Sequence, residues 1–149
     1  MKDKEKKLIP VFKELPADLE TPVSVFLKLA RTPNCFLLES VERGEQLGRY
    51  SFIGTAPYLV VQTQDSVGTI HHNQEISKVD LGMSQKYRDP LSLIQSLIAQ
   101  HGIPEVSGLP PFFGGAVGYL AYDVVRFFEK LPHCLEDELH LPDSIFIAS

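Results

Sequence analysis

Five short segments rich in β-branched and aromatic residues constrain the fold of this chain more than any other sequence feature. Turn signals such as Asp65-Ser66 and Asn73-Gln74 separate neighbouring segments. The segments span residues 35–40, 49–54, 58–64, 67–72 and 75–79. Their lengths and spacing predict an antiparallel meander.

Helices are predicted on both sides of this meander. Thr21 and Pro22 supply an N-cap and a first-turn proline, and apolar residues then recur at helical spacing through Ala30. Asp89 and Pro90 repeat this pattern ahead of a second helix, which is predicted to run to a stop at Gly102. Further along, residues 112–132 predict a strand that runs into a helix capped by Asp123. The expected fold class is α+β, an antiparallel β-sheet with flanking helices.

Composition and charge exclude several classes of protein. The chain has 149 residues, the size of one domain, with 44% hydrophobic and 22% charged residues, which are ordinary globular proportions. A net charge of −5 gives no electrostatic reason to bind nucleic acid or an anionic membrane. No segment has the pattern of a signal peptide or a bilayer span, so we expect a cytoplasmic protein in which Cys35 and Cys134 are reduced thiols.

The last residues suggest a longer protein. The sequence DSIFIAS, residues 143–149, is apolar and β-prone and has no polar tail after it. Natural termini are usually surface segments. We therefore expect the chain to be a piece of something longer.

No metal or catalytic site is predicted. His71 and His72 are adjacent, so in a strand they point to opposite faces, and the remaining histidines lack the spacing of a zinc site. His101 is expected in the last turn of the second helix. The possible nucleophiles are in no activating sequence context; they are Ser40, Ser51, Cys35 and Cys134.

Two further patterns have structural interpretations. GGAVG, residues 114–118, matches no phosphate-binding motif, and glycines inside a strand typically let another backbone approach closely. Asp123, Arg126 and Glu129 recur at i, i+3 spacing, which suits a solvated helix face with modest ion pairing.

Glu39 and Ser40 directly follow the apolar run of the first β-prone segment. One interpretation is structural: polar groups meet solvent at a strand end, and the serine caps a turn. The other is a site for a free amino acid, whose ammonium seeks a carboxylate and whose carboxylate seeks hydroxyl or N–H donors. The residue types leave both interpretations open.

The stretches FLLESVERGEQLGRYSFIG, residues 36–54, and PPFFGGAVGYLAYDVVRFFE, residues 110–129, together resemble the N-terminal region of anthranilate synthase component I. The resemblance covers most of the chain, from about the first helix onward. It implies an α+β unit within a larger two-domain α/β-sandwich enzyme. The related aminodeoxychorismate synthases share a looser version of these motifs and remain an alternative, as does a stand-alone amino-acid-binding module.

The resemblance also implies a role for each motif. The LLES segment would form part of the pocket for the feedback inhibitor L-tryptophan, with Ser40 as the first polar contact and Glu39 either attracting the ammonium or supporting the site from behind. The implied pocket residues are Leu38, Glu39, Ser40, Arg49, Tyr50 and Ser51.

The catalytic machinery is expected outside this chain. In the family, the chorismate site, the carboxylates that bind Mg²⁺ and the acid–base residues lie in a C-terminal domain. Residues 1–149 would then be a regulatory domain with no catalytic residue, metal or cofactor of its own. The implied partners are that C-terminal domain and a glutamine amidotransferase, component II, which supplies ammonia.

Overall fold

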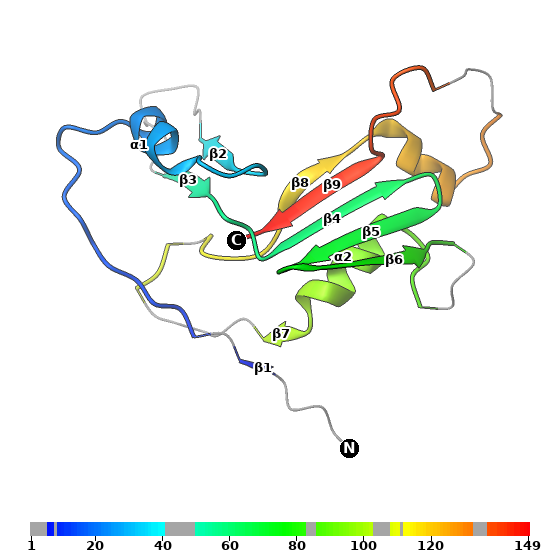
Figure 1. Cartoon of the computed structure of the whole chain (residues 1–149), viewed down its shortest axis with the longest axis horizontal. Helices are drawn as coiled ribbons and strands as arrows, with labels where there is room; N and C mark the ends of the chain where they lie inside the picture. Colours follow the sequence, from blue (N-terminus) through cyan, green and yellow to red (C-terminus); the bar gives the residue numbers. More distant parts are fainter. Residues whose placement is uncertain are drawn as a thin grey trace.

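The structure is a computed structural model that describes the backbone of residues 6–7 and 101–102, together with residues 9–40, 50–82, 86–100, 108–110, 112–132 and 137–149. Figure 1 shows its elements. The helices are α1 (Pro22–Leu29), α2 (Pro90–Ile98) and the 3₁₀-helix η1 (Tyr122–Phe127). The strands are β1 (Lys6–Lys7), β2 (Phe36–Glu39), β3 (Ser51–Gly54), β4 (Leu59–Gln64), β5 (Val67–His72), β6 (Glu75–Asp80), β7 (His101–Gly102), β8 (Val117–Leu120) and β9 (Ser144–Ala148).

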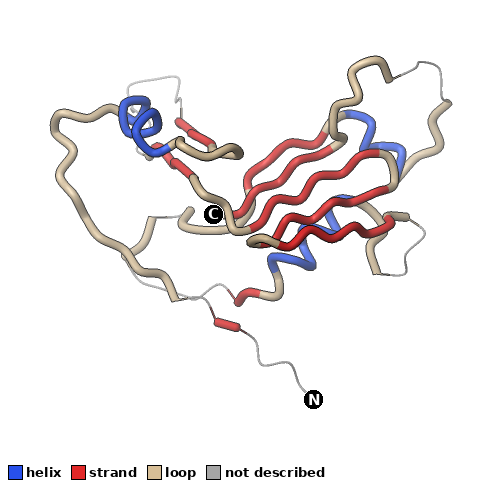
Figure 2. The backbone as a smooth tube through the Cα atoms, in the orientation of Figure 1, coloured by secondary structure: helices blue, strands red, loops and turns tan. Residues whose placement is uncertain are grey.

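An antiparallel sheet with the strand order β6-β5-β4-β9-β8 contains the core of the protein. Helix α2 lies against this sheet, as Figure 2 shows. Its Leu93 and Ile94 pack in one cluster with residues of β4 and β5, namely Leu59, Val61 and Ile70. Burial of these apolar side chains is the main favourable term for folding. The predicted α+β class, with an antiparallel sheet and flanking helices, is confirmed.

The two proline-capped helices are confirmed as well. Thr21 accepts a hydrogen bond from the backbone N–H of Ser24, and Asp89 does the same for Ser92. In each case the serine hydroxyl accepts a bond in return from the backbone N–H of the cap residue, which completes a capping box. Local sequence therefore fixes where both helices begin. None of the helices in the described residues has the length and apolar character that crossing a bilayer requires.

The predicted single meander is wrong in one respect. Strands β4, β5 and β6 do form a meander, whereas β2 and β3 pair with each other in a separate two-stranded sheet. Between β3 and β4, Ala56 has a φ of 48° and Pro57 follows it. A residue with a left-handed backbone conformation, followed by a proline that has no N–H to donate, ends the hydrogen-bonded pairing of strands. The chain therefore leaves the hairpin before the main sheet begins.

Two helix boundaries also differ from the predictions. Helix α2 ends at Ile98, and His101 lies beyond it in β7, where it pairs with Lys6 of β1. The predicted cap Asp123 is inside the first turn of η1, whose N-cap Ala121 makes no side-chain bond. Asp123 instead accepts a hydrogen bond from Arg126 at 2.8 Å, which confirms the ion pairing expected for this helix face.

Gly118 shows why a glycine stands in β8. A Cβ atom at this position would lie 1.9 Å from the carbonyl oxygen of Ile145, on the neighbouring strand β9. Such a distance is far inside van der Waals contact, so any other residue would push the two strands apart. The interpretation of the GGAVG glycines as sites of close backbone approach is confirmed at this residue.

Thr63 of β4 and Ser144 of β9 form a buried hydroxyl pair. Their oxygens are 2.7 Å apart, and neither residue has exposed surface. Each hydroxyl meets part of the other's hydrogen-bonding need where water has no access. The pair therefore favours one register between two strands that are distant in the sequence.

We predict that Thr63→Val lowers the free energy of unfolding by about 1–3 kcal/mol, because it leaves the Ser144 hydroxyl buried without its partner. Urea denaturation of the chain measures the change. Thr69→Val, a half-buried threonine of β5, is the control and should have a smaller effect. Adding Ser144→Ala to Thr63→Val should recover part of the loss; a strictly additive further loss would contradict the coupling.

Asp143, next to Ser144, provides a prediction about pH. Burial raises the pKa of its carboxyl; a hydrogen bond from the Asp65 backbone opposes this shift, and the neighbouring carboxylates of Asp65, Asp123 and Asp137 add to it. The folded pKa is thus above the unfolded one, so the ionised carboxyl reduces stability at neutral pH. This reduction is complete above the folded pKa and disappears below the usual value of 3.8.

Asp143→Asn should therefore raise the unfolding free energy at pH 7, since the amide oxygen can still accept the Asp65 bond without a charge. The difference between variant and parent should shrink as the pH falls through the raised pKa. Urea midpoints measured from pH 3 to pH 8 test this expectation. A difference that does not vary with pH would contradict it.

Candidate functional site

The β2–β3 hairpin brings together the two stretches that carry the predicted site. In its register Leu38 is opposite Phe52, and Glu39 is opposite Ser51. Residues opposite each other in an antiparallel pair share one face of the sheet. Glu39 and Ser51 are therefore neighbours on one face, while Leu38 and Phe52 are neighbours on the other.

Ser40 and Tyr50 close the open end of the hairpin. The Ser40 hydroxyl donates a hydrogen bond to the Tyr50 carbonyl oxygen at 3.4 Å. Five of the predicted site residues thus lie within one short hairpin: Leu38, Glu39, Ser40, Tyr50 and Ser51. The sixth, Arg49, is outside the described residues.

The side chains at this end of the hairpin are exposed. Leu38 is 42% exposed and Tyr50 is 37% exposed, and Glu39, Ser40 and Ser51 are also in the exposed class. The Ser40 hydroxyl lies on the same face as Leu38 and Tyr50, whereas the Glu39 carboxylate and the Ser51 hydroxyl lie on the opposite face. These groups match the ammonium, carboxylate and apolar side chain of a free amino acid. A pocket at this position remains a prediction.

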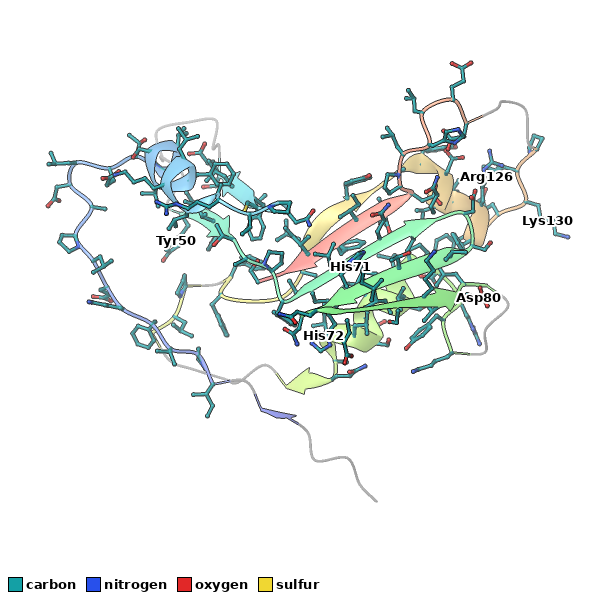
Figure 3. The ribbon with its side chains drawn as sticks, viewed as in Figure 1. Tyr50, His71, His72, Asp80, Arg126 and Lys130 are labelled. Carbon is teal, nitrogen blue, oxygen red and sulfur yellow. The ribbon has the colours of Figure 1, made fainter. Side chains whose placement is uncertain are left out.

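Two aromatic residues that sequence reasoning missed extend this surface. The rings of Tyr50 and Phe52 stack with their centroids 5.9 Å apart, and Phe112 meets Phe52 edge-on at 5.3 Å. Tyr50 is labelled beside β3 in Figure 3. Phe52 follows Tyr50 by two positions, so strand alternation could have placed it on the same face. No sequence signal indicated the contact with Phe112, which comes from a distant loop.

Gly54 and Phe36 shape the other end of the same face. The Phe36 ring lies over Gly54, where an added Cβ would come within 2.1 Å of a ring carbon. Phe36 and Gly54 are opposite each other in the hairpin register. The glycine therefore gives the phenylalanine ring room to cover the strand, and the face from Phe36 to Ser40 is apolar except at its polar end.

Helix α1 lies beside the hairpin, as Figure 1 shows. Glu20, just before the helix, pairs with Lys28 and accepts a hydrogen bond from Ser24 at 2.6 Å. The hydrogen bonds from Lys28 and Ser24 lower the pKa of the Glu20 carboxyl. These contacts tie the start of α1 to its last turn, although no residue of the helix is buried.

The remaining sequence candidates lie elsewhere. His71 and His72 are exposed on β5, well away from Tyr50 in Figure 3, as predicted for residues of an exposed hairpin. The Cys35 thiol is free and donates a hydrogen bond to the Thr32 carbonyl at 3.0 Å. Cys134 and His133 fall outside the described residues. Within the described parts of the chain, no group of three or more His, Cys, Asp or Glu side chains is placed to hold a metal ion.

Comparison with known proteins returns one name repeatedly. The chain is 39% identical over 145 residues to anthranilate synthase component 1 of Acetivibrio thermocellus, an alignment that covers 97% of the chain. It is 42% identical to the proteins of the same name from Thermus thermophilus and Pseudomonas aeruginosa, in each case over 95% of the chain. No family model matches it.

The chain spans 28% of the length of each of these relatives. The part that it matches is their N-terminal region. The similarity therefore extends over both quoted motifs and the hairpin between β2 and β3. Along nearly its whole length the chain resembles the N-terminal region of anthranilate synthase component 1, which confirms the resemblance found in its motifs.

Proposed function

We propose that residues 1–149 form the N-terminal, regulatory part of an anthranilate synthase component I in tryptophan biosynthesis. The observation that supports this proposal is an identity of 39–42% to proteins of that name over at least 95% of the chain. The complete protein would convert chorismate and ammonia to anthranilate and pyruvate. Component II, a glutamine amidotransferase, would supply the ammonia, and the reaction would take place in the cytoplasm.

The chemistry is assigned to the part of the polypeptide that lies outside this chain. Anthranilate formation requires Mg²⁺, and the described residues offer no group of carboxylates placed to bind it. The proposal assigns no catalytic step to residues 1–149. The role that we propose for this part is to bind a regulator and to pack against the catalytic domain.

The proposed regulator is L-tryptophan, bound at the open end of the β2–β3 hairpin. The Ser40 hydroxyl would donate to its carboxylate in place of the 3.4 Å bond to Tyr50. The Glu39 carboxylate, which lies on the opposite face of the hairpin, would attract the ammonium around the strand end or support the site from behind. Leu38 and Tyr50 would contact the indole, with Ser51 and Arg49 completing the polar rim. Leu38, Glu39, Ser40, Tyr50 and Ser51 are exposed in this chain, so the catalytic domain would supply the opposite wall.

Inhibition then requires two arrangements of the domains. Tryptophan can shift their equilibrium only by as much as its affinity differs between them. A site with one wall in each domain provides that difference, because moving the domains apart removes half of the contacts. The inhibitor would thus favour a less active arrangement without touching the chorismate site.

The proposed division of roles predicts where activity is found. The complete polypeptide, supplied with chorismate, Mg²⁺ and ammonia, should form anthranilate, and residues 1–149 alone should not. The fluorescence of anthranilate measures both reactions. Anthranilate formation by the isolated chain would refute the assignment of catalysis to the other part. Aminodeoxychorismate as the product would favour the aminodeoxychorismate synthase alternative.

The proposed inhibitor site predicts an effect of substituting Ser40. In the complete protein, Ser40→Phe should raise the tryptophan concentration for half-inhibition by about tenfold or more, because it removes a charge-assisted hydrogen bond and fills the pocket. The kcat and the KM for chorismate should stay near the parent values. Titration of the initial rate with tryptophan provides the measurement.

Ser77→Phe is the matched control, since Ser77 is an exposed serine on strand β6, far from the hairpin in the sequence. It should leave inhibition unchanged. If Ser40→Phe and Ser77→Phe were inhibited like the parent, Ser40 would not belong to the inhibitor site. A loss of kcat in Ser40→Phe would contradict the proposal that Ser40 acts on inhibition alone.

A further inference from the structure

The two edges of the five-stranded sheet differ in their chemistry. Strand β6 forms one edge and carries Glu75, Lys78 and Asp80, charges that oppose pairing with another strand. Strand β8 forms the other edge, and its sequence VGYL has no charge and no proline. Among the residues that the structure describes, β8 pairs only with β9. The β6 edge is therefore protected by charge against pairing with another strand, and the β8 edge has no such protection.

The surface of β8 is also apolar. Tyr119 is 46% exposed and Leu120 is 42% exposed. The Tyr119 hydroxyl donates to the Pro142 carbonyl at 3.1 Å, which ties the strand to the segment before β9. A fixed strand with free backbone groups and an apolar surface suits the addition of another strand.

We propose that a β-strand from the part of the polypeptide outside residues 1–149 pairs with β8 and extends the sheet. The inference rests on the proposed function, in which this chain is one part of a longer protein. The relatives support a segment of sufficient length, since the chain spans only 28% of each. Val117 at the start of β8 is opposite Ile147 near the end of β9. In the longer protein of the proposed function, a segment that continues from β9 would therefore start one strand away from this edge.

A second copy of the chain is a less favourable occupant. The net charge of −5 makes two copies repel each other, whereas a strand on the same polypeptide has a high effective concentration. The observed contrast between the edges then has a simple cause. The edge that needs protection from other molecules carries charges, and the edge that a segment of the same polypeptide covers does not.

Amide hydrogen exchange at single-residue resolution tests the pairing. In an antiparallel edge strand, alternate residues direct their N–H away from the neighbouring strand, so two of the four amides of Val117–Leu120 should exchange rapidly in the 149-residue chain. In the complete protein these two should exchange at least tenfold more slowly. The outward amides of β6 are the internal control and should exchange at similar rates in both proteins.

A pair of matched variants provides the second measurement. Leu120→Lys puts a charge on the β8 edge, and Ile76→Lys puts one on β6, where Ile76 is 66% exposed. Leu120→Lys should restore rapid exchange of the outward β8 amides in the complete protein and leave the urea midpoint of the 149-residue chain unchanged. Ile76→Lys should leave β8 protected.

Three outcomes would overturn the pairing. Rapid exchange of the β8 amides in the complete protein is the first, and protection that survives Leu120→Lys is the second. The third is protection of β8 in the 149-residue chain that rises with concentration together with a dimer in sedimentation, which would assign the edge to a second copy. A complete protein that makes anthranilate but leaves β8 unprotected would refute the pairing alone, because exchange does not depend on the reaction.

Discussion

The insertion of β9 between β4 and β8 is the interaction on which the rest of the fold depends. Its five residues form ladders with strands on both sides, and Ser144, Ile147 and Ala148 are buried. Without β9, the meander β4–β5–β6 would have a second open edge, and β8 would have no partner among the described residues. The buried Thr63–Ser144 pair and the close approach at Gly118 both lie on this strand's two ladders. Tyr58, directly before β4, extends the β4–β9 ladder, because its N–H donates to the Ala148 carbonyl at 3.0 Å.

Sequence reasoning succeeded where the deciding interactions are local. Thr21 and Asp89 cap the helices that follow them, and each cap bond spans three residues. The turns Asp65-Ser66 and Asn73-Gln74 join adjacent strands, and both Asp65 and Asn73 adopt a positive φ that suits their residue types. Strand order depends on contacts between residues about 80 positions apart, which no local pattern encodes. The insertion of β9 therefore could not be predicted, and neither could the break at Ala56, whose residue type rarely takes a left-handed conformation.

The candidate site likewise combines local features that the sequence predicts with long-range contacts that it does not. The sequence placed Glu39 and Ser40 at the end of a β-prone run, and the motif resemblance added the stretch around Tyr50. The register of the hairpin then explains why two stretches ten residues apart belong to one site, since Ser40 bonds to the Tyr50 carbonyl. Phe112 joins this surface through a loop that lies just before β8, so its contact with Phe52 depends on the whole fold. A helix does follow β8, but the prediction that Asp123 caps it was wrong. Asp123 is the second residue of the 3₁₀-helix and pairs with Arg126.

Burial is unevenly distributed between the two sheets, and this has a consequence for the proposed regulation. The main sheet and α2 contain the buried core, whereas α1 has no buried residue and, of the hairpin residues that the structure describes, Gly54 alone is buried. Segments with little buried apolar surface open and move at low free-energy cost, and ligand sites are often drawn from them. A ligand that orders such a segment can change its position relative to a neighbouring domain, while the same ligand on the rigid core would change little. Under the proposed function, the hairpin with α1 is therefore the part of this chain in which a bound regulator would alter the arrangement of domains without unfolding the sheet.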